Sequence, residues 1–236
     1  MKIAIMQPYF LPYLGYFQLL NHVDYFIVYD KVQYSKKGWF NKNSFLMNGN
    51  AKLFSIPIKK DSDYLHVSER ELALNAEKEI LKILGQIKSA YSKSKYFNEV
   101  YPLLRQIFLF EDKNLFRFIF NAIQKVHDAL DLNAELVISS NIEEGDELKG
   151  QDRVISLCKR MKADEYINPE GGINLYDSGA FKESNIELKF LKKNLISYEQ
   201  FGNAFIDNLS IIDVLMFNGI DKTKALLDEF QLFKKN

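Results

Sequence analysis

The chain has little cysteine, no net charge and no long apolar run. Its single cysteine, Cys158, excludes an internal disulfide and favours a reducing compartment. Lys plus Arg number 31, as do Asp plus Glu, and this balance argues against bulk nucleic-acid binding, although a local anion pocket stays compatible with it. The N-terminal apolar run stops at Gln7, too soon for a signal peptide or a membrane span. We therefore expect a soluble, cytoplasmic protein.

Signatures of three common enzyme classes are also missing. The chain has no Gly-x-Ser-x-Gly elbow, no Walker phosphate loop and no Gly-x-Gly-x-x-Gly fingerprint. Serine hydrolases, P-loop kinases and Rossmann oxidoreductases are therefore disfavoured. With one cysteine, and with His22, His66 and His127 far apart in the sequence, no metal site is expected.

The sequence does contain a strand–helix–strand pattern in its first 43 residues. Residues 2–7 predict a buried strand, residues 13–22 an amphipathic helix and residues 24–30 a second strand. So short a unit predicts a parallel pair of strands. Polar and aromatic side chains follow both strand ends, which is where α/β folds bind ligands.

The rest of the chain predicts one α/β domain over residues 1–236, with a parallel-sheet core and a mostly helical insertion at about 70–130. Asn48-Gly49 predicts a hairpin turn. The other expected elements are a hairpin at 44–58, helices within 71–130 and at 152–161, 209–217 and 222–230, strands at 136–138, 165–168 and 186–191, and a mobile loop at 141–150.

The loop after the second strand is the strongest candidate for a ligand site. Lys36 and Lys37 offer ammonium groups for a phosphate, and Trp39, the only tryptophan, offers a ring for stacking. Gln33 and Asn41 add side-chain amides. The alternative interpretation is a solvated hairpin edge protected by lysines.

Two further candidates follow strands. Asp30 ends the second strand and could accept a proton from an amine, or bind Mg²⁺ or a ribose hydroxyl; the alternative is a turn-capping residue. Ser139 follows the strand at 136–138 and could contact a phosphate or sugar, or form a plain turn.

The segment after the strand at 165–168 is a third candidate. Gly171 and Gly172 allow the backbone to approach a ligand, while Asn168 and Glu170 offer contacts to sugar hydroxyls or an amine. Tyr176 lies just beyond. The alternative is a simple turn.

Residues 10–20 resemble the signature of the nucleotidyltransferase superfamily that contains pantothenate synthetase, in which a strand leads into a helix start with His-x-Gly-His. Gly15 matches the glycine, and Tyr13 and Tyr16 stand at the two His positions. The resemblance implies a Rossmann-like nucleotidyltransferase fold. Tyrosine is a neutral donor near pH 7, so an inherited role in charge stabilisation is weakened. The alternative is that both tyrosines are core residues of an amphipathic helix.

Motifs across almost the whole chain, from about residue 3 to 219, resemble the WbqC-like family. The segments that carry the resemblance are 7–20, 22–43, 138–140, 166–177 and 209–219. The family is associated with O-antigen and other surface-polysaccharide gene clusters, and a glycine transferase role has been suggested for some members. The resemblance implies a site at Gln7, Asp30, Gln33, Lys37, Trp39, Asn41, Asn168, Gly171 and Gly172.

These resemblances imply a transferase of surface-polysaccharide (O-antigen, lipopolysaccharide) biosynthesis. It would move an acyl or aminoacyl (glycyl) group to the amine of a nucleotide-linked amino sugar, with Asp30 and Lys37 as catalytic residues. The cofactor stays open: the donor is made here from ATP and Mg²⁺, or arrives preactivated on an acyl carrier. The alternatives are a non-catalytic nucleotide-sugar or glycan-binding protein and a nucleotidyltransferase relic acting as a scaffold. The acceptor sugar, the acyl group and the oligomeric state also stay open.

Overall fold

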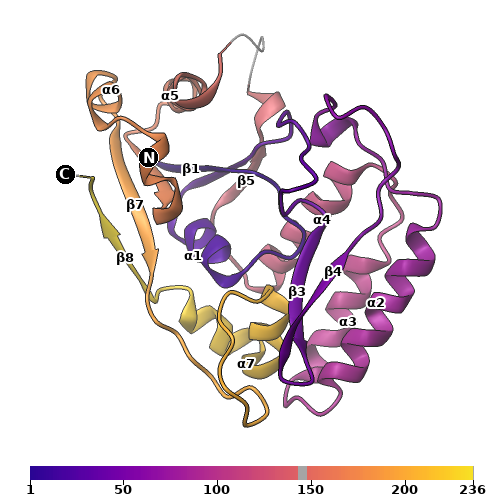
Figure 1. Ribbon diagram of the computed structural model, residues 1–236. Coiled ribbons are helices and arrows are strands. Elements are labelled where there is room, and N and C mark those ends of the chain that lie inside the picture. Colours follow the sequence, from indigo (N-terminus) through magenta and orange to yellow (C-terminus); the bar gives the residue numbers. More distant parts are fainter. Residues whose placement is uncertain (143–147, 236) are drawn as a thin grey trace.

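The computed structural model describes residues 1–142 and 148–235 and contains a six-stranded sheet flanked by helices (Figure 1). Part of the loop expected at 141–150 lies outside the described residues. Neighbouring strands are parallel except for β7 and β8, so the expected parallel core is confirmed within a mixed sheet. In spatial order the strands are β5 (Glu135–Ile138), β2 (Tyr25–Val28), β1 (Lys2–Met6), β6 (Glu165–Pro169), β7 (Glu187–Lys193) and β8 (Phe230–Phe233).

The strand order places a topological switch point between β1 and β6. From β1 the chain builds outward through β2 to β5, then returns to the other side of β1 with β6 and β7. Because the connections leave β1 and β6 in opposite directions, a crevice forms beyond the carboxyl ends of these two strands. The residues that follow β1 and β6 are therefore placed to form a ligand site.

Both faces of the sheet are covered. Along β1, Ile3 and Ile5 belong to one buried hydrophobic cluster and Ala4 to the other, as the alternation of side chains in a strand requires. Burial on both sides explains why these strands are short apolar runs in the sequence. The helices are α1 (Leu14–His22) and α7 (Ile211–Leu226) on the Ala4 face, and α5 (Gly150–Arg160) and α6 (Ser178–Glu183) on the Ile3 face.

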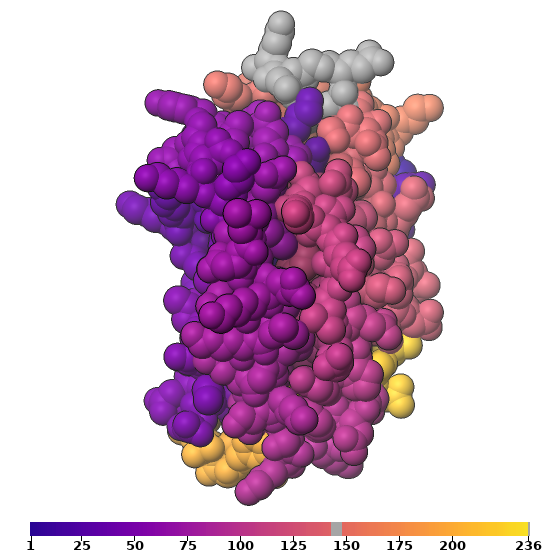
Figure 2. Space-filling view, turned by 90° about the vertical axis from the view of Figure 1, so that its right-hand side faces the viewer, coloured from indigo at the N-terminus to yellow at the C-terminus, as the bar shows by residue number. Residues whose placement is uncertain are grey.

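The chain between β2 and β5 forms a hairpin and then three helices. Asn48 and Gly49 both have positive φ, 52° and 72°, as the tight turn predicted from Asn-Gly requires. The helices expected within 71–130 are present, and Figure 2 views this side of the molecule. The elements are β3 (Lys42–Met47), β4 (Asn50–Ser55), η1 (Val67–Glu69), α2 (Ala76–Tyr91), α3 (Phe97–Phe108) and α4 (Leu115–Ala129).

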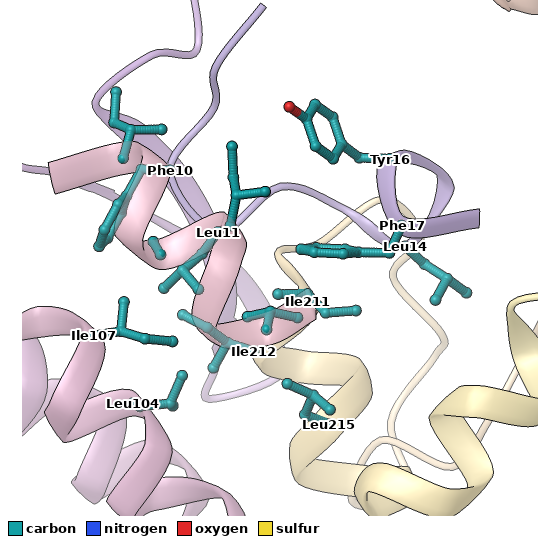
Figure 3. Close-up of a cluster of buried hydrophobic side chains, with 14 of the residues drawn as sticks. Phe10, Leu11, Leu14, Tyr16, Phe17, Leu104, Ile107, Ile211, Ile212 and Leu215 are labelled. Carbon is teal, nitrogen blue, oxygen red and sulfur yellow. The ribbon is translucent and has the colours of Figure 1, made fainter. Parts of the chain in front are cut away.

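Phe10 and Leu11, in the segment that joins β1 to α1, are buried in the core (Figure 3). The ring of Phe10 stacks on Phe118, with centroids 5.2 Å apart. Leu11 adopts a left-handed conformation with φ of 47°, which few side chains accept without support. Its carbonyl accepts hydrogen bonds from Ser210 Oγ at 2.6 Å and Asn43 Nδ2 at 2.7 Å. These contacts fix the start of α1.

A buried carboxylate on α7 holds the segment that joins β7 to α7, here called the strap (194–209). Asp213 accepts hydrogen bonds from Tyr91 Oη at 2.6 Å, Tyr198 Oη at 2.7 Å and Gln200 Nε2 at 2.7 Å. Burial raises the pKa of the Asp213 carboxyl above its ordinary value. Because Tyr198 and Gln200 belong to the strap, Asp213 fixes the strap to the core.

The C-terminal end differs from the sequence prediction. A helix to residue 230 was expected, but α7 ends at Leu226 and Phe230 begins β8. The prediction is wrong because pairing with β7, a tertiary contact, decides the conformation of this short apolar segment. The expected helix break at Asn218-Gly219 is confirmed: Gly219 has φ of 70° and ψ of −177° inside α7.

Candidate functional site

A cavity of about 760 Å³ lies at the switch point between β1 and β6. Its volume is within the range of small-molecule sites, about 300–1,000 Å³. Four segments line it: residues 9–15 after β1, residues 39–43 before and within β3, residues 169–171 at the end of β6 and just beyond it, and the end of β7 with the strap. These segments are far apart in the sequence, and the order of the strands brings them together.

The wall after β1 is aromatic. Tyr9, Tyr13 and Gly15 line the cavity, and burial raises the pKa of both tyrosines, so their hydroxyls stay neutral. A Cβ atom at position 15 would lie 2.5 Å from Cε2 of Tyr13, so glycine leaves room for that ring. Tyr9 Oη donates to Gln7 Oε1 at 3.0 Å, and the fully buried Tyr16 donates to the Gln7 carbonyl at 3.2 Å. Tyr16 therefore packs in the core, whereas Tyr13 lines the cavity.

The turn after β6, which forms the short 3₁₀ helix η3 (Glu170–Leu175), is held by a buried network. Asn168 Nδ2 donates to Tyr166 Oη at 2.7 Å and to Tyr176 Oη at 3.4 Å, and the two hydroxyls lie 3.0 Å apart. A Cβ atom at position 172 would lie 2.1 Å from Asn168 Oδ1, so Gly172 is needed for this arrangement. Gly171 lines the cavity. Asn168, Gly172 and Tyr176 thus support the turn that presents Gly171.

The wall formed by the end of β7 and the strap carries charges of both signs. Lys193 is largely buried, forms an ion pair with Asp207 and donates to Asn208 Oδ1 at 3.2 Å. Lys192 is exposed, with its Nζ 3.9 Å from Glu170 Oε2. Of these residues the sequence suggested only Glu170. The available signal was the pair of lysines directly after the strand expected at 186–191.

Trp39 forms the rim of the cavity. The residue is 49% exposed, and Lys42 Nζ lies 5.5 Å from its ring centroid. The next residue, Phe40, accepts a hydrogen bond from the Phe10 amide at 3.0 Å, which joins the Trp39 loop to the turn after β1. An exposed aromatic ring beside a cavity is suited to stacking on a planar ligand group.

The other polar residues of this loop lie in a second, open hollow of about 400 Å³. Gln33, Lys36 and Lys37 line it together with Asp63. Lys36 Nζ lies 3.1 Å from an Asp63 carboxylate oxygen, and Gln33 Nε2 donates to the Asp63 carbonyl at 2.9 Å. The structure thus places Trp39 in one depression and these three residues in another. Ligand binding by Gln33 and Lys36, and catalysis by Lys37, stay predictions.

Asn41 is buried, and its side chain joins the loop to β4. Its Nδ2 donates to the Ile56 carbonyl at 2.7 Å and to Ser55 Oγ at 3.2 Å, and its Oδ1 accepts from Tyr34 Oη at 3.0 Å. These contacts give Asn41 a structural role, and its predicted contact with substrate stays untested.

Asp30 and Ser139 meet at the carboxyl ends of β2 and β5. Ser139 Oγ donates to Asp30 Oδ1 at 2.7 Å, and the Ser140 amide donates to the same oxygen at 3.0 Å. Asp30 and Ser139 are both buried, and Ser139 begins η2 (Ser139–Asn141). The contact agrees with the capping interpretation. Among the described residues that line the 760 Å³ cavity, neither is present, and their predicted roles stay predictions.

Fold and cavity together define an α/β protein with a mostly parallel sheet and a ligand-sized cavity at its switch point. The model of the WbqC-like protein family matches residues 7–225, and the chain belongs to this family. It is similar to an uncharacterised protein of Mycobacterium tuberculosis, 28% identical over 222 residues that cover 92% of this chain and 93% of the relative. Membership suggests a role in polysaccharide-related biosynthesis.

No solved structure matches the chain. The family resemblance drawn from the sequence is confirmed, while the resemblance to nucleotidyltransferases stays a hypothesis. Within residues 1–142 and 148–235, no helix has both the length and the apolar character needed to cross a bilayer.

Proposed function

We propose that the chain binds a nucleotide-linked amino sugar in the switch-point cavity and transfers an acyl or aminoacyl group, such as glycyl, to the sugar amine. It would act as a transferase of surface-polysaccharide biosynthesis. The observation that carries the proposal is the composition of the cavity, which combines aromatic rings, two lysines and two carboxylates at the carboxyl ends of parallel strands.

Each part of such a ligand finds a suitable group. The exposed face of Trp39 can stack on a nucleobase or sugar ring. Lys192 and Lys193 supply positive charge for a diphosphate. Glu170 and Asp207 supply carboxylate oxygens for sugar hydroxyls or an ammonium group. A simple sugar would leave either the lysines or the aromatic rim without a partner, so the nucleotide-linked form fits better.

Transfer requires an activated acyl donor, because a free carboxylate does not acylate an amine. The donor would enter the same cavity as a thioester or an acyl phosphate. Catalysis would then come from holding the amine against the acyl carbonyl and from the charges around them. Tyr13, whose hydroxyl stays neutral, is suited to donate a hydrogen bond to either substrate, whereas the Tyr9 hydroxyl already donates to Gln7 Oε1.

A second candidate function is non-catalytic binding of the same nucleotide sugar. Among the described residues that line the cavity there is no histidine and no cysteine. The Lys193–Asp207 pair is also satisfied within the chain. A binding protein needs this shape and charge but no proton-transfer group, so the two functions differ in whether product forms.

A ligand screen followed by mass spectrometry tests the proposal. Thermal shift with UDP-, GDP-, CDP- and dTDP-linked amino sugars is expected to show stabilisation by at least one of them. Incubation of that ligand with glycyl thioester, glycyl phosphate, or ATP and glycine is expected to add one glycyl unit to the sugar. Stabilisation without product from any donor would favour the binding protein. Absence of stabilisation by the whole panel would refute both functions.

A further inference from the structure

We infer that Glu170 accepts the proton of the acceptor amine, and that Lys192 leaves its ion pair with Glu170 when the ligand phosphate binds. The inference rests on the proposed function and deepens it, because it assigns the proton transfer to a carboxylate in the cavity. The sequence placed this role at Asp30, whose side chain is buried and bonded to Ser139 and to the Ser140 amide.

Position favours Glu170 among the described carboxylates of the cavity. It directly follows β6, one of the two strands that border the crevice, and it lines the cavity. The other lining carboxylate, Asp207, is held by Lys193, which is itself largely buried. Glu170 has a looser contact, with its Oε2 at 3.9 Å from Lys192 Nζ and its side chain 50% exposed. An incoming ligand can therefore reach it.

The support behind Glu170 is rigid although its side chain is accessible. Asn168, Tyr166 and Tyr176 bond to one another in the turn that carries it, and Gly172 packs against Asn168 Oδ1. A base on a fixed turn loses less freedom on meeting its substrate than one on a loose loop. Burial and, after it, the negative charge of Glu170 raise the pKa of Tyr13, and both residues line the cavity. The turn therefore holds Glu170 at the same cavity as the aromatic wall.

The chemistry requires such a base. Near neutral pH the sugar amine is largely an ammonium ion, which has no lone pair for attack. The Glu170 carboxylate takes one proton and leaves a neutral amine, whose nitrogen attacks the acyl carbonyl carbon. The carbon–nitrogen bond forms, the bond from the carbonyl carbon to the thiolate or phosphate breaks, and that group leaves with the electron pair. The second nitrogen proton leaves with the departing group, and Glu170 returns its proton to water.

Lys192 couples this step to ligand binding. In the free protein its Nζ lies 3.9 Å from Glu170 Oε2, and an exposed ion pair at this distance is weakly held. A ligand diphosphate carries more charge than one carboxylate, so Lys192 turns to the phosphate and leaves the Glu170 oxygens open to the ammonium group. The same ligand therefore supplies the amine and releases Glu170, the base that deprotonates it, from its ion pair with Lys192.

The test compares Glu170→Gln with Glu199→Gln, a control at an exposed glutamate of the strap. Both variants are expected to melt as wild type does and to bind the stabilising UDP-, GDP-, CDP- or dTDP-linked amino sugar within about threefold of wild type. Loss of a general base lowers transfer by about 100-fold or more in Glu170→Gln alone.

The other outcomes distinguish failure of this inference from failure of the proposed function. Wild-type transfer with undiminished transfer by Glu170→Gln would overturn the inference and leave the proposed function standing. Loss of ligand affinity with an unchanged kcat would assign Glu170 to binding only, which also overturns it. Absence of transfer by the wild type with every donor would refute the function itself. For Lys192→Met, affinity is expected to fall about tenfold for the nucleotide sugar and to stay unchanged for the free amino sugar; equal effects on both would exclude the phosphate contact.

Discussion

Gly172 and Asn168 are in such close contact across the turn after β6 that a Cβ atom at position 172 would lie 2.1 Å from Asn168 Oδ1. Asn168 cannot move aside freely, because it is buried and its Nδ2 donates to Tyr166 Oη at 2.7 Å. We expect Gly172→Ala to lower the free energy of unfolding by about 1–3 kcal/mol, the usual cost of overpacking. Urea unfolding measures this change.

Gly171→Ala is the matched control for that substitution. A Cβ atom at position 171 would have no heavy atom within 4 Å. We therefore expect its unfolding free energy to stay within about 0.5 kcal/mol of wild type. Equal destabilisation by both alanines would show that the Asn168 contact does not constrain the turn.

Trp39 and Lys37 belong to the same loop but to different depressions, so their substitution is expected to have different effects. Loss of a stacking ring costs about 1–3 kcal/mol, so Trp39→Ala is expected to weaken nucleotide-sugar binding about tenfold or more. Lys37→Ala is expected to change it less than twofold. Calorimetric titration of the two variants makes the comparison. A larger loss in Lys37→Ala would place the ligand in the hollow beside Asp63 and would support the catalytic role expected for Lys37 from the sequence.

Asp213 is expected to make stability depend on pH in the acid range. Burial raises its native pKa above the unfolded value, so between those two values the native state binds more protons than the unfolded state. The contribution of Asp213 to stability is therefore greatest below the unfolded pKa, about 3.9. It falls as the pH rises toward the raised native pKa.

Asp213→Asn, which cannot titrate, serves as the reference for this effect. The stability of wild type relative to the variant is expected to decrease as the pH rises through the window. Urea unfolding at a series of pH values measures the difference. A constant or rising difference would contradict the assignment.

Cys158 is expected to be unreactive in the folded protein. It is buried on α5, and burial raises the pKa of its thiol to about 12, so almost none of it is thiolate at pH 8. A chromogenic disulfide reagent is expected to react with it slowly in buffer and rapidly in urea. Because it is the single thiol of the chain, the signal has one source. Fast reaction in buffer would show that α5 opens readily from the sheet.

Local patterns were sufficient to predict the first strand–helix–strand unit and the β3–β4 hairpin. The residue types within the Asn48-Gly49 turn and within the apolar run from Ile3 to Ile5 are enough to determine their conformations. The β8 strand at Phe230 was missed because its partner, β7, lies about 40 residues earlier in the chain. The sequence of a four-residue apolar segment does not indicate which distant strand it pairs with.

The lining of the cavity was predicted only in part, because some of its residues are brought there by long-range strand pairing. Tyr13, Gly15, Trp39 and Gly171 were named from the sequence and do line the cavity. Lys192 was not named, because its approach to Glu170 depends on the pairing of β6 with β7. The separation of Trp39 from the lysines before it depends on how the loop packs, which residue type alone does not reveal.

The position of a bound ligand tests the central claim most directly. Crystals of the protein soaked with the stabilising nucleotide-linked amino sugar are expected to show it at the switch point between β1 and β6. Its ring is expected against Trp39, its phosphates near Lys192 and its amine near Glu170. Density for the ligand in the hollow lined by Lys36 and Lys37, or at Asp30 and Ser139, would contradict the account.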